Sequence, residues 1–142
     1  MIWLLILVFI LVSGFIWYVS KRHIDHFTSF EDPYLSSLVD KLSTEFPELK
    51  LFQLRGSHKS FTVDKEHMYI CILDSNQKYY EENTIIHVIL HELAHALCST
   101  QDFTEEHSPE FHRIFEKLLT RASNAGLYDA QKSVQKGYCG YT

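Results

Sequence analysis

The segment from residue 83 to residue 112, NTIIHVILHELAHALCSTQDFTEEHSPEFH, constrains the fold more than any other part of this 142-residue chain. Residues 85–98 are apolar on nearly every side, which is typical of a helix at the centre of a domain. Polar side chains in such a helix are costly unless they are paired. His91 and His95 are four residues apart, so they lie one helical turn from each other and can bind a single metal ion. The segment therefore predicts a central, metal-binding helix.

A third metal ligand is expected from a separate element that folds back beside this helix. A catalytic zinc site has three protein ligands and one open position for water. His107 follows His95 by twelve residues, across a loop long enough to reverse the chain, and it precedes a helix predicted to start at Ser108-Pro109. Glu110 and His112 lie on the first turn and a half of that helix, so either could replace His107 as the third ligand.

The predicted metal ligands are His91, His95 and His107. Glu92 lies beside the ion, where it can take a proton from a bound water as general base. His87 is one further turn away, and the rotation of the helix favours a supporting role over metal ligation. Cys98 is two turns from His91, and a buried small side chain is its expected role. A fourth protein ligand such as His87 or Cys98 would instead indicate a structural metal site.

His91-Glu92-Leu93-Ala94-His95, followed by His107-Ser108-Pro109-Glu110-Phe111, resembles the SprT-like and WLM-type zinc metallopeptidases, in which the third histidine opens a similar string. The resemblance covers about residues 66–120. It implies a small zincin-type domain with a Zn2+ cofactor held by the three histidines, Glu92 as catalytic base, and protein or peptide substrates. The chain differs from the DNA-associated members because it is acidic and lacks an evident zinc finger or basic tail, so their DNA-linked role is not carried over.

The pattern around the motif predicts an α+β domain over residues 34–126. Asp32-Pro33 is a helix start, with Asp as N-cap and Pro in the first turn. Three short strands, at about residues 49–56, 60–63 and 68–73, predict an antiparallel or mixed sheet. The motif helix begins near residues 81–84, with Asn83 or Thr84 as its cap, and the last helix ends at Gly126. Residues 127–142 form a weakly patterned tail.

The amino-terminal segment predicts a membrane anchor. Residues 1–20 contain no charged side chain and, at about 1.5 Å per residue, span roughly the 30 Å of a bilayer core. A cleaved signal peptide is the alternative, but the basic region before the apolar run and the small-x-small cleavage site are both missing. Lys21 and Arg22 follow the apolar run, which places the globular part on the cytosolic side of a single-pass protein, after a linker of residues 21–33.

The net charge and the cysteine content indicate which binding partners and which cellular compartment to expect. A net charge of -5 and the lack of a dense Lys/Arg run argue against a nucleic-acid partner. Cys71, Cys98 and Cys139 are odd in number and widely spaced, so we expect reduced thiols in the cytosol rather than a disulfide framework.

Three functions remain at this point. The first is a membrane-anchored, zinc-dependent metallopeptidase that hydrolyses peptide bonds with a zinc-activated water. The second is a catalytically inactive zinc-binding membrane protein that serves as a structural or interaction module. The third is an anchored helical scaffold without a metal.

Overall fold

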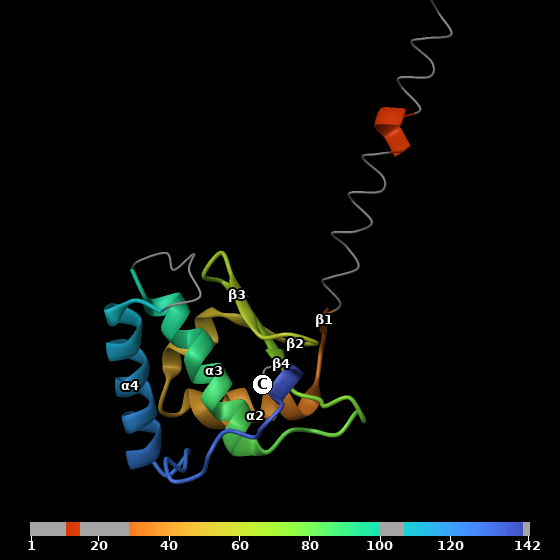
Figure 1. Cartoon of the computed structure of the whole chain (residues 1–142). Coiled ribbons are helices and arrows are strands. Elements are labelled where there is room, and N and C mark those ends of the chain that lie inside the picture. Colours follow the sequence, from red (N-terminus) through yellow and green to blue (C-terminus); the bar gives the residue numbers. More distant parts are fainter. Residues whose placement is uncertain (1–10, 15–28, 100–106, 141–142) are drawn as a thin grey trace, which may run out of the picture.

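The computed structural model describes residues 11–14, 29–99 and 107–140. Figure 1 shows the arrangement of its helices and strands. In chain order, the elements of the domain are β1 (Ser29–Phe30), α2 (Pro33–Ser43), the 3-10 helix η1 (Pro47–Leu51), β2 (Gln53–Ser57), β3 (Phe61–Val63), β4 (His67–Cys71), α3 (Glu82–Leu97), α4 (Pro109–Asn124) and the 3-10 helix η2 (Tyr138–Gly140).

The four strands form one mixed sheet in the order β1-β2-β4-β3. β2 and β4 are parallel, whereas β1 and β3 pair antiparallel at the two edges. The predicted α+β class and mixed sheet are confirmed, but the number of strands was wrong because β1 lies in the segment that we expected to be a linker. The first predicted strand also began too early, since Pro47 starts η1 and places Leu49 in the core.

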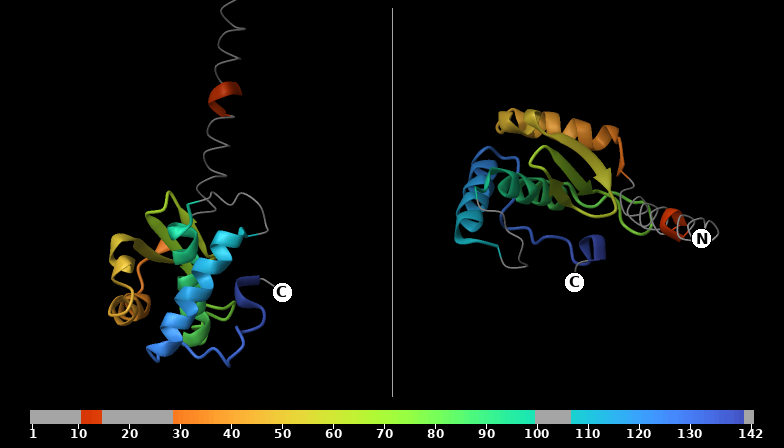
Figure 2. Two further views of the ribbon diagram at one scale, coloured as in Figure 1. Left: turned by 90° about the vertical axis from the view of Figure 1, so that its left-hand side faces the viewer. Right: turned by 90° about the horizontal axis from the view of Figure 1, so that it is seen from above.

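The core lies between the inner face of the sheet and the helices. α2 packs against β2, and α3 packs against β3 and β4. Figure 2 shows α4 on the side of α3 that faces away from the sheet. The fully buried side chains come from every layer and include Leu42, Met68, Ile70, Ile85, Ile89 and Phe111. α3 is therefore covered on several sides, as its apolar sequence predicts.

Local capping explains where two of the helices start. The Asp32 carboxylate accepts hydrogen bonds from the backbone amides of Tyr34 and Leu35 at 2.9 and 3.0 Å, and Pro33 is the first helical residue. The Ser108 hydroxyl accepts from the Phe111 amide at 3.1 Å in the same way. Both predicted helix starts are confirmed, because each depends on neighbours only a few residues away.

The cap predicted for α3 was wrong, because its two candidate residues bind the carboxyl-terminal tail. The N-cap is Glu81, which makes no side-chain capping bond. The Asn83 side chain accepts from the Asp129 amide at 2.8 Å and donates to the Asp129 carbonyl at 3.1 Å. The Thr84 hydroxyl accepts from the Gln135 amide at 3.0 Å. The tail is thus held along the first turn of α3.

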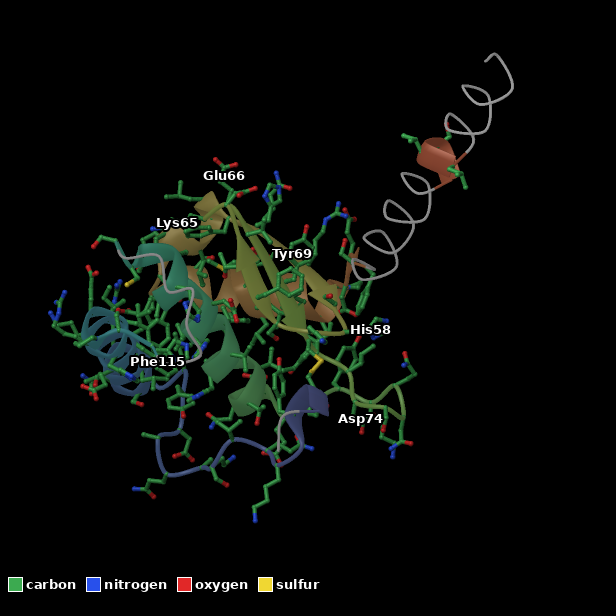
Figure 3. All side chains as sticks on the ribbon, turned by 45° about the horizontal axis from the view of Figure 1, so that its top comes forward. His58, Lys65, Glu66, Tyr69, Asp74 and Phe115 are labelled. Carbon is green, nitrogen blue, oxygen red and sulfur yellow. A yellow bond between two sulfur atoms is a disulfide. The ribbon has the colours of Figure 1, made fainter. Side chains whose placement is uncertain are left out.

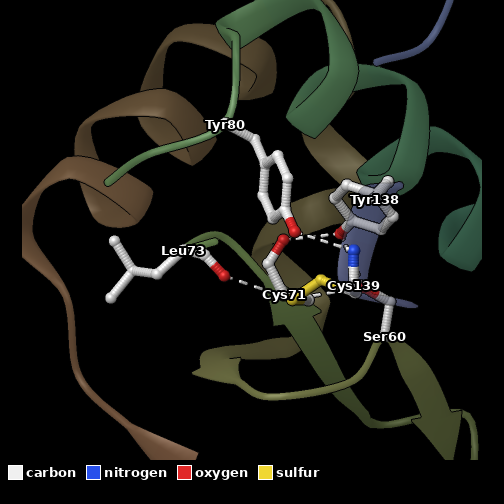
Figure 4. The surroundings of a disulfide bond; sticks show 6 residues. All are labelled: Ser60, Cys71, Leu73, Tyr80, Tyr138 and Cys139. Carbon is white, nitrogen blue, oxygen red and sulfur yellow. Dashed lines mark hydrogen bonds between the residues drawn. A yellow bond between two sulfur atoms is a disulfide. The ribbon is translucent and has the colours of Figure 1, made fainter. Parts of the chain in front are cut away.

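A disulfide between Cys71 and Cys139 joins the end of β4 to this tail. Figure 4 shows its surroundings, where the Tyr138 hydroxyl donates to the Cys71 carbonyl at 2.5 Å and the Tyr80 hydroxyl accepts from the Cys139 amide at 2.8 Å. Our expectation of reduced thiols was therefore wrong for this pair. The two cysteines are 68 residues apart, and spacing along the chain does not reveal that the tail returns to the sheet. Cys98 is buried and takes no part in this disulfide.

The predicted anchor falls mostly outside the described residues. Of residues 1–20, the structure describes only 11–14, which form one exposed helical turn. Over the described parts of the chain, no helix has both the length and the apolar character needed to cross a bilayer.

Candidate metal centre

α3 presents the motif side chains to two different neighbours. Successive residues on a helix point about 100° apart, so His91 and Glu92 leave the helix in different directions. The His91 ring packs edge-on against Phe111 and Phe115 of α4, with centroid distances of 4.9 and 5.2 Å. Figure 3 shows Phe115 among the side chains between α4 and α3. Glu92 instead faces β3, where it contacts Thr62. The histidines and the carboxylate therefore approach the site from adjacent faces of one helix.

His107 enters the site from the residue just before the N-cap of α4. Its ring stacks on Phe111, with centroids 4.0 Å apart and planes at 26°. Phe111 is only 1% exposed, so the stacking holds the imidazole of His107 against the core. The Nε2 atom of His107 lies 3.1 Å from that of His95, which in turn lies 3.2 Å from that of His91. The structure thus brings all three predicted ligands together.

The three histidines fit a zinc ion in both geometry and chemistry. Each offers one ring nitrogen, and these atoms all lie within 4.8 Å of one another. Four-coordinate zinc binds imidazole nitrogen at about 2.0–2.1 Å, which corresponds to nitrogen–nitrogen separations of about 3.3 Å in a tetrahedral site. Burial, helped by the neighbouring His95 and His107, lowers the pKa of His91 to about 3. His91 is therefore held in the neutral form that binds metal.

The structure places His107, and neither of the alternative third ligands, in the cluster of possible metal ligands. The Glu110 carboxylate accepts hydrogen bonds from the Ser99 hydroxyl at 3.0 and 2.8 Å, which turns it toward the end of α3. His112 is exposed, and its ring centroid is 5.9 Å from that of His107. Within residues 29–99 and 107–140, the cluster of possible metal ligands contains His107 and neither of these residues.

The two candidate fourth ligands also lie outside the cluster. His87 lies one helical turn before His91, and its Nδ1 atom is 3.1 Å from the Tyr128 hydroxyl. The Cys98 thiol points toward Glu110 Oε2, at 3.5 Å, and toward the Ser108 hydroxyl, at 3.7 Å. Of the residues that the structure describes, only the three histidines form such a cluster, which is the ligand number of a catalytic rather than a structural zinc site.

Glu92 is almost completely buried, with 4% of its surface exposed. Burial raises the pKa of its carboxyl group to about 7, and a hydrogen bond from Thr62 opposes this shift. The Thr62 hydroxyl donates to Glu92 Oε2 at 2.7 Å. We did not single out Thr62 from the sequence, because nothing in a short strand indicates which helix residue lies opposite it.

A groove on the described surface lies away from this centre. It has a volume of about 690 Å3 and lies along the outer side of α4, between Glu45 and the basic side chains of Arg113, Lys117 and Arg121. None of the three histidines lines it, and Glu92 does not line it either. The chemistry that the chain can carry out is therefore assigned from the cluster of side chains rather than from the size of a cavity.

Comparison with known proteins supports the resemblance that the motifs indicate. A model of the SprT-like family matches residues 37–131. Uncharacterized protein 136R of Invertebrate iridescent virus 6 is 41% identical over 90 residues, which are 61% of this chain and 48% of that protein. Uncharacterized protein 042R of Invertebrate iridescent virus 3 is 38% identical over 95 residues, 66% of this chain and 55% of that protein. Uncharacterized protein R325 of Acanthamoeba polyphaga mimivirus is 29% identical over 112 residues, 76% of this chain and 52% of that protein.

The chain spans about half the length of these viral relatives. No solved structure matches it. The region matched by the family runs from α2 to the start of the tail and contains Glu92 together with the three clustered histidines. Because this region makes up more than half of the sequence, the chain belongs to the SprT-like family.

Proposed function

We propose that this protein is a zinc-dependent metallopeptidase that hydrolyses peptide bonds in proteins or peptides. The observation that carries the proposal is the convergence of three imidazole nitrogens within 4.8 Å of one another, next to the buried carboxylate of Glu92. Membership of the SprT-like family, which is associated with zinc and peptidase activity, supports the same reaction. Among the described residues, the cluster of three histidine ligands favours the enzyme over an inactive zinc-binding module.

In this mechanism, His91, His95 and His107 would hold the ion and Glu92 would move the proton. Zinc, when bound, lowers the pKa of a coordinated water and polarises the carbonyl group of a substrate. Glu92 takes a proton from the attacking water as the new carbon–oxygen bond forms. It then returns that proton to the amine nitrogen as the carbon–nitrogen bond breaks. The low exposure of Glu92 keeps bulk water from competing for the same proton.

The position of β3 supports a peptide as the substrate. β3 is the last strand of the sheet order and pairs with β4. Its Thr62 contacts Glu92, so the strand passes directly beside the proposed base. An edge strand can bind an extended peptide through main-chain hydrogen bonds. A peptide paired with β3 would therefore lie next to the proposed zinc site.

We also propose that residues 1–20 anchor the domain in a membrane and that the domain faces the cytosol. The uncharged apolar run and the basic residues Lys21 and Arg22 support this topology. The Cys71–Cys139 disulfide argues against a cytosolic location, because disulfides are typical of oxidising compartments. Protease protection of the domain in sealed membrane vesicles tests the orientation. The test uses vesicles whose outer face is cytosolic. Digestion of the domain only after these vesicles are opened would refute the cytosolic orientation.

The activity is tested with the purified full-length chain and its Glu92→Gln variant, assayed on a mixture of unstructured peptides. The wild type should contain one zinc ion per chain, lose hydrolysis with a chelator and regain it when zinc is returned. The Gln side chain has a similar shape but cannot accept the proton, so the variant should keep its zinc and lose activity by about 100-fold or more. Equal activity in both proteins would refute the role of Glu92. Zinc without hydrolysis in the wild type would favour the inactive zinc-binding module.

A further inference from the structure

The hydrogen bond between Thr62 and Glu92 connects the edge strand to the proposed base. The Thr62 hydroxyl lies 2.7 Å from Glu92 Oε2 and 3.3 Å from the Glu92 carbonyl oxygen. A hydroxyl carries a single proton, and the shorter contact has the better distance for an O–H···O bond. The proton is therefore directed at the carboxylate. A hydrogen bond to a buried charged group is among the stronger ones in proteins.

The hairpin of β3 and β4 holds Thr62 in place. Thr62 is the strand partner of Met68, which is fully buried, so both side chains belong to the face of the sheet that meets α3. At the turn of the hairpin, Lys65 Nζ donates to the Cys98 carbonyl at 2.5 Å. Figure 3 shows Lys65 at this turn, near the end of α3.

The two attachments lie at different points along the hairpin and the helix. Thr62 lies in β3, whereas Lys65 lies in the turn that follows the strand. Glu92 lies within α3, whereas Cys98 is the C-cap of that helix. The hairpin therefore lies along α3 with its position fixed at both points, and Thr62 stays opposite Glu92.

We propose that Thr62 is a positioning residue for catalysis, which fixes the carboxylate of Glu92 through Oε2 and leaves Oε1 for the attacking water. Glu has three side-chain torsions, so an untethered carboxylate would sample several orientations. A catalytic group displaced by about 1 Å can lose about 100-fold in rate. This inference rests on the proposed function. It also links the strand that would bind the substrate to the group that moves the proton.

The test compares Thr62→Val, which removes the hydroxyl and keeps the branched shape, with Thr62→Ser, which keeps the hydroxyl and removes the methyl group. Thr120→Val, on an exposed position of α4, is the matched control. Zinc-loaded full-length proteins are assayed for kcat, KM, zinc content and thermal stability. Thr62→Val should lower kcat by about 10- to 100-fold, with KM and zinc content unchanged. Thr62→Ser should stay within about threefold of the wild type, and Thr120→Val should match it.

A Thr62→Val variant with wild-type kcat would overturn the inference. An equal loss in Thr62→Ser would also overturn it, because the methyl group rather than the hydroxyl would then be needed. A second measurement does not depend on activity. Side-chain scalar couplings of Glu92 should report one rotamer in the wild type and in Thr62→Ser, and rotamer averaging in Thr62→Val. A wild type that binds zinc without hydrolysis would refute the proposed function alone, whereas unaltered couplings in Thr62→Val would refute the role of Thr62.

Discussion

Loss of the Cys71–Cys139 disulfide should lower the stability of the domain substantially. The two cysteines are 68 residues apart, and the chain-entropy relation assigns about 4 kcal/mol to a cross-link that closes a loop of roughly this length. Measured effects of disulfides are commonly about 2–4 kcal/mol, because the denatured chain keeps some structure. For a domain of this size, about 4 °C of melting temperature corresponds to 1 kcal/mol, so a decrease of roughly 8–16 °C is expected.

Removing the disulfide should change the free energy of the denatured chain more than it changes the contacts of the folded domain. The tail is also held by Tyr138, which is 7% exposed and bonds to the Cys71 carbonyl, and by the backbone of Gln135, which bonds to Thr84. These contacts do not require the sulfur–sulfur bond. A Cys71→Ser/Cys139→Ser double variant should therefore fold to the same structure and melt at a lower temperature.

The assay is thermal unfolding of the wild type and the double variant, each with and without a reductant. The reductant should lower the melting temperature of the wild type and leave that of the double variant unchanged. Counting thiols provides the decisive control, since the chain has three cysteines. The unfolded, unreduced wild type should react at Cys98 alone, and all three thiols should react after reduction. Three reactive thiols before reduction would refute the cross-link.

Three further predictions concern the core and the charges of the site. A Cβ at Gly56 would overlap the ring of Phe30, so Gly56→Ala should cost about 1–3 kcal/mol in urea unfolding, and adding Phe30→Ala should reduce that cost. Leu42 is fully buried, so Leu42→Ala should cost about 2–5 kcal/mol without changing the zinc content. In metal-free protein, burial lowers the pKa of His91 from 6.5 to about 3 and raises that of Glu92 from 4.5 to about 7. Between pH 6.5 and 4.5 the unfolded chain therefore binds more protons at His91, whereas the folded chain binds more protons at Glu92. The two groups change the free energy of unfolding with pH in opposite directions, so their contributions largely cancel over this range. Glu92→Gln should remove this cancellation, so that stability falls more steeply from pH 6.5 to 4.5; equal slopes would contradict the assigned shifts.

The part of the site that lies on one helix could be predicted because its geometry is local. The spacing of His91 and His95 determines that both point to one side of α3, whatever the helix packs against. The placement of His107 was less certain, because Glu110 and His112 lie within the next five residues. Packing of His107 on Phe111 selects it, and this contact depends on how α4 docks against α3.

The features that depend on near neighbours could be predicted from the order of the residues alone. These are the caps at Asp32 and Ser108, the central helix and the spacing of its histidines. The contacts between distant segments are seen only in the folded chain: His95 with His107 across 12 residues, Thr62 with Glu92 across 30, and Cys71 with Cys139 across 68. Capping and helical periodicity arise within one or two turns, whereas these three contacts depend on the path of the whole chain around α3.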